Sequence, residues 1–240
     1  MILLSLDTCD ARGSVCLLRD GVAQAVVVHE TAEDYSSWLI PAIQRVLTQG
    51  GVSLVDVEVY AVSAGPGSFT GLRIGLTTVK ALAELYSRRV AAVSRLEAIA
   101  SEASGGEWIA ALVNGRRGEV YAGVYRREGE RVVLQGEESV APVAEFVKSV
   151  QRAIPGGGVC WATPDQELVV GTAWWAEREA AGDRVEEVTA VLAPRIGQIG
   201  YVQAQAGKLV DVLALDANYI RRSDAERSWK DARGDSQHAG

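Results

Sequence analysis

The sequence predicts an α/β protein in which two mixed β-sheets are covered by helices, and three observations support this fold class. Three hairpin-linked strands, a helix, a strand and a second helix are indicated in the first hundred residues, and the same order recurs after residue 107. Such an alternation places helices on the faces of mixed sheets. Of the 240 residues, 48% are apolar, so the chain can bury a substantial core.

The first copy of this order is the clearer of the two. Asp20-Gly21 is typical of a two-residue hairpin turn, and Gly50-Gly51 ends the first helix. Pro41 must lie near the first turn of that helix or kink it. The strands are predicted at 2–7, 14–18, 22–28, 57–64 and 90–93, and the helices at 36–49 and 69–87.

The second copy has similar residues at its turns and helix ends. Asn114-Gly115 and Glu128-Gly129 indicate turns, and Pro142 lies near the start of a helix, where proline is favoured. Residues 163–190 show no clear pattern. The strands are predicted at 108–113, 119–125, 131–140 and 159–162, and the helices at 141–153 and 195–207.

This duplicated order is the plan of the actin-like (ASKHA) fold, whose two halves are ribonuclease-H-like βββαβα domains. We therefore expect an N-terminal domain at 1–104, completed by C-terminal residues at about 208–222, and a C-terminal domain at 105–207. The boundary is expected in the polar stretch 101–107. Residues 223–240 are polar and mixed in charge, so we expect a disordered tail there.

The composition argues against several classes of function. The formal net charge is −7 without a dominant basic stripe, so the chain is not expected to grip nucleic acid alone. The three cysteines lack Cys-x-x-Cys spacing and only two histidines are present, which argues against a zinc site or a histidine-based hydrolase. Of these, His29 is expected to be a strand-end residue and not a catalytic base, and His238 lies in the polar tail. No apolar run could span a bilayer and the N-terminus lacks a basic leader, which indicates a cytoplasmic protein.

Residues 65–75, with the sequence GPGSFTGLRIG, form the most informative stretch. They indicate a strand-to-helix turn, in which Gly65 and Gly67 permit backbone angles that other residues avoid. Ser68 or Thr70 can cap the following helix, and the exposed amides at its start can hold an anion. The alternative is a closely packed turn without a ligand, because glycine loops of this kind are common.

The helix after this turn is apolar on two sides, and such helices are buried on two sides. The second side is expected to meet either another chain or a neighbouring helix of the same chain. Gly71 and Gly75 each cost the helix about 1 kcal/mol relative to Ala, which makes sense where another backbone approaches closely. The first stripe contains Leu72, Leu76, Val79, Leu82 and Tyr86, and the second contains Ile74, Thr78, Ala81 and Leu85.

Residues 65–75 also resemble the GPGSFTGLRIG signature of the TsaB (YeaZ) family. The resemblance is strong over residues 1–125 and faint from about 140 to 215. The supporting matches are Leu6-Asp7-Thr8 with Gly13-Ser14-Val15 for the N-terminal hairpin, Leu39-Ile40-Pro41 for a Leu-x-Pro pattern, residues 115–121 (GRRGEVY) for a DARRGEVY segment, and residues 218–221 (NYIR) for a Tyr-Leu-Arg ending.

The resemblance implies a non-catalytic relative of TsaD that shares its fold and lacks its metal-binding histidines. It implies a heterodimer with TsaD through the first two helices, joined by the small ATPase TsaE. That assembly transfers threonylcarbamoyl from threonylcarbamoyl-AMP to N6 of adenosine 37 in tRNAs that read codons beginning with A. ATP and a divalent metal then belong to the partner subunits, tRNA is met only through the complex, and the isolated chain is a candidate for homodimerisation.

The residues predicted to bind the partner lie at the start of the first helix and along the second. Tyr35 occupies a position where the family often has His, and exposed aromatic residues such as Tyr35 and Trp38 make good interface anchors. Burial of Trp38 in its own domain is an equally compatible alternative. The full set is Tyr35, Trp38, Leu39, Gly71, Ile74, Gly75, Thr78, Ala81 and Leu85.

A second set comprises candidates for contacting a phosphate or another anion. In sugar kinases and actin relatives, acids at the first turns of the two domains organise the metal and phosphate. Asp7 keeps the first position, whereas Asn114 cannot supply the charge that magnesium favours, so no catalytic or metal-binding residue is predicted. The arginine pair at 116–117 is also compatible with a solvated turn. The candidates are Asp7, Ser68, Thr70, Arg116 and Arg117.

Two alternatives to a partner subunit follow from the fold and from its relatives. A small ATP-dependent kinase of the same fold would bind and turn over nucleotide alone, but Asn114 and the lack of a second glycine-rich phosphate loop argue against it. A peptidase is disfavoured, because two histidines cannot provide a metal-ligand pair or a nucleophile–base pair.

Overall fold

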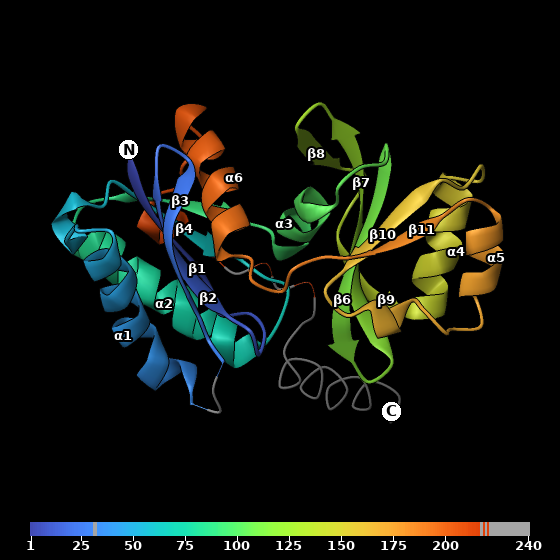
Figure 1. The fold of residues 1–240 in the computed structure, drawn as a ribbon, viewed down its shortest axis with the longest axis horizontal. Helices are drawn as coiled ribbons and strands as arrows, with labels where there is room; N and C mark the ends of the chain where they lie inside the picture. The colour runs from blue at the N-terminus through green and yellow to red at the C-terminus, as the bar shows by residue number, and fades with distance from the viewer. Residues whose placement is uncertain (31–32, 217, 219, 221–240) are drawn as a thin grey trace, which may run out of the picture.

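The computed structural model describes residues 1–30, 33–216, 218 and 220, which form two β-sheets alternating with three layers of helices (Figure 1). The middle layer lies between the sheets, where buried residues of α3 and α6 share one core cluster with strands of both sheets. The helices, in layer order, are α1 (Tyr35–Gln49) with α2 (Phe69–Leu85), then α6 (Ala193–Gln205) with α3 (Arg95–Glu102), then α4 (Val143–Ala153) with α5 (Trp175–Ala180).

The first sheet has the strand order β3-β2-β1-β4-β5. The first three strands are antiparallel, whereas β4 and β5 run parallel to β1. Helices cover both faces of the sheet, so its central strands β1 and β4 are buried along almost their whole length and are mostly apolar. The strands are β1 (Ile2–Asp7), β2 (Ser14–Arg19), β3 (Val22–Val28), β4 (Val59–Ser63) and β5 (Arg89–Val93).

The second sheet repeats this plan in the order β11-β10-β6-β7-β8, with β9 also paired to β7. The predicted strand at 131–140 is wrong as one element, because the chain leaves the sheet between β8 and β9 at Gly136, which has a φ of 84°. The strands are β6 (Trp108–Arg116), β7 (Glu119–Glu128), β8 (Arg131–Leu134), β9 (Ser139–Pro142), β10 (Val159–Thr163) and β11 (Arg184–Glu187).

The two helices of the middle layer are exchanged between the halves of the sequence. Helix α3, which the sequence did not indicate, follows β5 of the first sheet but packs on β6, β7, β8 and β10 of the second. Helix α6 packs on the first sheet, where Gly197 and Gly200 allow close approach: a Cβ at Gly197 would lie 2.2 Å from Leu18 Cδ1. The predicted domains 1–104 and 105–207 therefore do not follow the packing. We use "first lobe" for the first sheet with α1, α2 and α6, and "second lobe" for the second sheet with α3, α4 and α5.

The segment after α6 returns to the first lobe. Val210 forms an antiparallel bridge with Val90, and Leu215 is buried in the core beneath α1 and α2. This placement agrees with the expected completion of the first domain by residues after 207, as far as the chain is described. The expected disordered tail at 223–240 lies outside the described residues. In the described part of the chain, no helix combines the length and apolarity that crossing a membrane requires.

Candidate functional site

A cleft of about 960 Å³ opens between the lobes where β1 and β6 end. Its walls come from segments that are far apart in sequence: the β1–β2 turn, the corner before α2, the start of α3, the β6–β7 turn and the loop after β10. The polar and charged residues on its walls include Asp10, Tyr35, Ser68, Thr70, Arg95, Asn114, Arg116, Arg117 and Asp165.

The two strands that end at the cleft make the same local turn. The Asp7 carboxylate accepts a hydrogen bond from the backbone N–H of Cys9, at 2.9 Å. The Asn114 side-chain oxygen accepts one from the N–H of Arg116, at 2.7 Å. Asp and Asn both favour this turn, in which the side-chain oxygen accepts a hydrogen bond from the backbone N–H two residues further along the chain. Asn114 therefore preserves the geometry of the second turn without its charge.

The floor of the cleft is an ion cluster built from this chain. Arg95, the first residue of α3, is 1% exposed and donates to Asp10 Oδ2 at 2.7 Å, while its Nε lies 3.5 Å from Oδ2 of the fully buried Asp7. Burial disfavours the charged guanidinium, but Asp7 and Asp10 outweigh burial and raise the pKa of Arg95 above its ordinary value. Partial burial also acts to raise the pKa of Asp10, yet Arg95 keeps it below its usual value. Both groups are therefore charged at neutral pH.

Asp165 brings a third carboxylate to the same place from the loop after β10. Burial, and then repulsion from Asp10, raise the pKa of Asp165, while Arg95 and the backbone of Asn114 oppose the rise. Asp165 and Asp10 both line the cleft. Charges from both lobes therefore meet around the guanidinium of Arg95.

The corner before α2 is a packed and capped turn. Ser68 caps α2 by accepting a hydrogen bond from the N–H of Gly71 at 3.3 Å, and its own N–H donates to the Cys9 carbonyl at 2.7 Å. A Cβ at Gly67 would lie 2.3 Å from that same carbonyl oxygen, so only glycine fits there. The side chains of Ser68 and Thr70 are exposed on the cleft wall. The turn is packed and capped, and anion binding by this helix start stays a prediction.

The arginine pair sits opposite this corner in an unusual conformation. Arg116 has a φ of 63° and Arg117 a φ of 55°, values that are uncommon for residues other than glycine. Both side chains are exposed on the cleft wall. Four of the five predicted anion contacts thus line one cleft. Asp7 is a correction: it lies beneath the wall, and its charge is turned to Arg95.

The outer side of α2 carries the second apolar stripe. Leu85 is 71% exposed, Ala81 is exposed, and Ile74 and Thr78 are half-buried. The inner side of the same helix is packed against the first sheet through Leu72, Leu76 and Val79. Among the described residues, therefore, no neighbouring helix of this chain fully covers the outer stripe.

The two glycines of α2 have a different role from the one predicted. A Cβ at Gly71 would lie 1.9 Å from the Thr8 carbonyl oxygen, and one at Gly75 would lie 2.4 Å from Thr8 Oγ1. Thr8 also donates from Oγ1 to the Gly71 carbonyl at 2.7 Å. The backbone that approaches α2 closely is thus the β1–β2 turn of this chain, and the assignment of Gly71 and Gly75 to partner contact is corrected.

Two predicted contacts at the start of α1, Trp38 and Leu39, are also corrected, whereas partner contact by Tyr35 stays a prediction. Trp38 is 3% exposed and Leu39 is 1% exposed, because they begin the buried stripe that continues through residues 42, 43, 46 and 47 onto the sheet. Tyr35 is half-buried: its hydroxyl donates to the Asp10 carbonyl and accepts from the N–H of Gly13 at 2.7 Å. The exposed apolar side chain on this helix is Ile40, which was not predicted.

His29 is a structural residue at the end of β3. Its Nδ1 lies 3.0 Å from the Ala11 carbonyl oxygen and its Nε2 lies 2.7 Å from the Glu33 carbonyl oxygen. The ring also packs on Tyr35, with centroids 4.4 Å apart. The ring nitrogens thus lie within hydrogen-bonding distance of two backbone carbonyls, one in the β1–β2 turn and one shortly before α1.

Sequence reasoning missed the charged residues on which the cleft depends, namely Asp10, Arg95 and Asp165. The signal for Arg95 was weak: it follows the helix cap Ser94, but Glu97 in the same short helix makes the segment look like an ordinary amphipathic helix. Asp10 and Asp165 follow strand ends, where ligand-facing acids often lie in α/β folds.

Comparison with known proteins places the chain among tRNA-modification proteins. The family model described as "TsaD: tRNA N6-adenosine threonylcarbamoyltransferase" matches residues 23–162. The tRNA threonylcarbamoyladenosine biosynthesis protein TsaB of Escherichia coli is 31% identical, with 96% of this chain and 97% of the relative covered. TsaB of Bacillus subtilis is 28% identical, with 95% and 98% covered.

Solved structures agree with these relatives. A Pseudomonas aeruginosa protein described as similar to the peptidase YeaZ has a TM-score of 0.75 at 28% identity, covering 92% of this chain and 99% of that one. YeaZ of the same organism has a TM-score of 0.71 at 26% identity, covering 91% and 99%. A hexokinase of the ROK family from Thermus thermophilus, at 15% identity and a TM-score of 0.55 over 85% of this chain and 100% of that one, shares the actin-like fold alone. The chain thus belongs to the TsaB (YeaZ) family, within the broader family that the TsaD model describes.

Proposed function

We propose that this chain is the non-catalytic partner subunit of a complex that transfers threonylcarbamoyl from threonylcarbamoyl-AMP to N6 of adenosine 37 in tRNAs reading codons that begin with A. Curated TsaB relatives are named for threonylcarbamoyladenosine biosynthesis, which supports the pathway. In this proposal the chain docks on a TsaD-type subunit and TsaE joins them. ATP, the divalent metal and the chemistry then belong to the partner subunits.

The observation that carries the proposal is the outer stripe of α2. The helix is already packed on its inner side, so the exposed Leu85 and Ala81 contribute little to folding where they stand. Covering a leucine side chain with another protein yields about 1.5–3 kcal/mol. Docking along this stripe therefore stabilises a complex without requiring α2 to rearrange.

The charge of the chain supports a shared role with tRNA. A formal net charge of −7 opposes phosphate binding, because affinity for nucleic acid comes largely from basic side chains that release counterions. A partner that supplies basic surface resolves this. The chain then holds the partner in a productive shape and meets tRNA only through the complex.

The test is binding of the purified chain to TsaD, measured by titration calorimetry. Ile74→Asp and Ala81→Arg place charges on the outer stripe, and each is expected to weaken binding about 100-fold. The matched control is Ala144→Arg, which puts the same charge on an exposed alanine of α4, in the outer helix layer of the second lobe. This control should bind TsaD as the unaltered chain does.

Native-like affinity of Ile74→Asp and Ala81→Arg, with circular dichroism showing folded variants, would contradict the docking surface. If the isolated chain homodimerises, light scattering of the same variants should show monomers. Modification of tRNA by this chain without TsaD would overturn the non-catalytic role itself.

One observation favours the kinase alternative: a cleft lies between the lobes, in a fold that this chain shares with a hexokinase. It requires ATP turnover by the isolated chain that depends on Asp7. Asp7 is fully buried and faces Arg95, and the matching residue of the second lobe is the neutral Asn114. These positions disfavour phosphoryl transfer assisted by a metal, and ATP turnover by the isolated chain decides the matter.

A further inference from the structure

The floor of the cleft holds two carboxylates against the same edge of one guanidinium. Asp10 Oδ2 is 2.7 Å from Arg95 Nη2, and Asp7 Oδ2 is 3.5 Å from Arg95 Nε. Asp7 and Arg95 are both almost completely buried. The carboxylates come from the end of β1 and the β1–β2 turn of the first lobe, whereas Arg95 begins α3 of the second lobe.

Two like charges beside each other in a poorly solvated place are relieved when one of them is protonated or when a cation lies beside both. Proteins provide such a cation either as a bound ion or as a basic side chain. Magnesium and manganese are commonly held by one or two carboxylates, with water completing the shell. The pair formed by Asp7 and Asp10 therefore has the chemistry of a weak divalent-cation site, apart from the guanidinium that fills it.

We propose that Arg95 is a tethered cation that takes the place of a divalent ion between Asp7 and Asp10 and thereby excludes such ions from the cleft. Among the described residues, no group of three or more His, Cys, Asp or Glu converges in a way that could hold a metal ion.

The hydrogen bonding around Arg95 points to the same arrangement. Asp7 Oδ2 and Arg95 Nε are buried side-chain atoms without a hydrogen-bond partner, because the 3.5 Å between them is too long for one. A buried carboxylate oxygen that has only a charge beside it retains capacity for another ligand. Removing the guanidinium exposes that oxygen, together with Asp10, to an ion from the cleft.

Exclusion of divalent ions by Arg95 does not depend on whether the chain docks on TsaD. Its consequence is that an anion entering the cleft binds to this chain without a divalent ion. A metal-bound anion would bring its ion to carboxylates that the guanidinium of Arg95 already occupies.

The experiment measures binding of Mn²⁺ alone by the loss of its free-ion electron paramagnetic resonance signal as protein is added. The full chain is expected to leave the signal nearly unchanged, whereas Arg95→Ala should bind Mn²⁺ at least about 10-fold more tightly. Arg95→Lys keeps the charge and should restore exclusion. The double variant Arg95→Ala/Asp10→Asn should lose the binding that Arg95→Ala gains.

Arg195→Ala is the matched control. It removes an arginine paired with a single carboxylate, Glu102, at 2.6 Å and outside the cleft walls, so it should not create Mn²⁺ binding. Tight Mn²⁺ binding by the unaltered chain that Asp10→Asn weakens would overturn the proposal. So would a folded Arg95→Ala that binds Mn²⁺ no better than the unaltered chain. If Arg95→Ala does not fold, Arg95→Gln, which preserves most of the side-chain length, is held to the same outcomes.

Discussion

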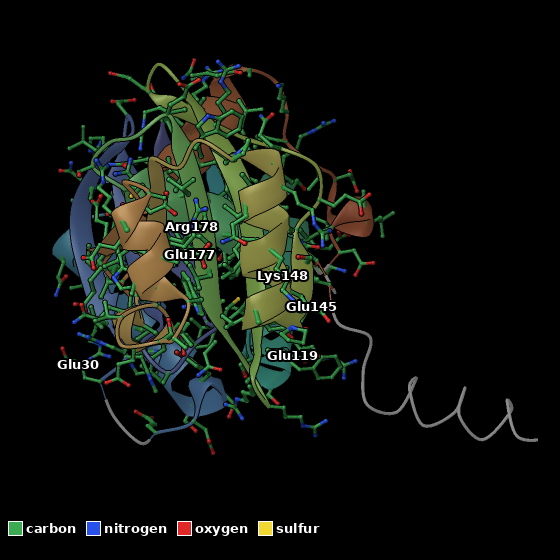
Figure 2. The ribbon with its side chains drawn as sticks, turned by 90° about the vertical axis from the view of Figure 1, so that its right-hand side faces the viewer. Glu30, Glu119, Glu145, Lys148, Glu177 and Arg178 are labelled. Carbon is green, nitrogen blue, oxygen red and sulfur yellow. The ribbon has the colours of Figure 1, made fainter. Side chains whose placement is uncertain are left out.

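The outer helices of the two lobes share a place in the fold but differ on the side that faces away from the sheet. Figure 2 shows α4 beside α5, with Glu145 and Lys148 projecting from α4, and both side chains are exposed. The buried side of α4 is confined to Phe146, Val147 and Val150. Helix α2 instead has apolar residues on both sides. One apolar face is therefore sufficient to hold an outer helix on its sheet, and the second face of α2 is available to a partner.

The turns at the cleft differ in a parallel way. Asp7 and Asn114 accept the same kind of backbone hydrogen bond, but only Asp7 is buried and charged against Arg95. The first lobe thus joins an ion cluster to its turn, while the second lobe retains the turn alone. The two lobes therefore share the geometry of the turn, but only the first has a charged side chain at it.

The largest expected change in stability comes from breaking this difference between the turns. Asp7→Asn keeps the turn but leaves Arg95 with less compensation, so we expect a loss of about 3–5 kcal/mol in the free energy of unfolding. Asn114→Asp should change it by less than about 1 kcal/mol, because an exposed Asp makes the same turn. Urea denaturation measures both. Equal losses would mean that the two turns are electrostatically alike.

Two leucine substitutions, one on each face of α2, distinguish the buried face from the exposed one. Leu76→Ala removes a buried contact with the first sheet and should cost about 2–5 kcal/mol. Leu85→Ala should change the free energy of unfolding by less than about 0.5 kcal/mol, because the side chain is 71% exposed. Thermal and urea unfolding check the pair. A comparable loss for Leu85→Ala would show that this chain already covers the outer stripe.

The smallest expected effect concerns the glycines that α2 has and α4 lacks. Gly71→Ala should cost about 1–3 kcal/mol, because its Cβ meets the backbone oxygen of Thr8. Gly75→Ala should cost less, since it meets the Thr8 hydroxyl, which can move. Unfolding free energies of both variants test the order. If Gly71→Ala were as stable as the unaltered chain but failed to bind TsaD, Gly71 would again be assigned to the partner-binding surface.

Much of the fold was predictable from local signals. Turn residues such as Asp20-Gly21 and the periodicity of 69–87 located the β2–β3 hairpin and α2 to within two residues. The turn predicted at Asn114-Gly115 is wrong, because β6 continues to Arg116 and the chain turns at Arg117-Gly118. Helix α3 was missed because it has only eight residues and follows β5 directly, so periodicity had little length in which to appear. For α6 the helix was predicted correctly, but not the sheet it covers.

The candidate site was predictable in part. Residues 65–75 and 114–117 led to two walls of the cleft, because glycine turns and paired arginines are visible in the sequence. Arg95, Asp10 and Asp165 were not found, since each is an ordinary charged residue until the others are placed beside it. Trp38 shows the opposite case: an aromatic residue near a helix start was equally compatible with an interface and a core.

The sequence by itself determined the order of strands and helices, the family, and the presence of two apolar faces on α2. Only the tertiary structure decided what covers each face, that Thr8 is the close neighbour of Gly71 and Gly75, and that Arg95 lies between Asp7 and Asp10. The physical reason is that hydrophobic burial is non-directional, so an apolar pattern shows that a face is covered without showing by what. A buried charge depends on partners from distant parts of the chain, and these meet only when the lobes come together.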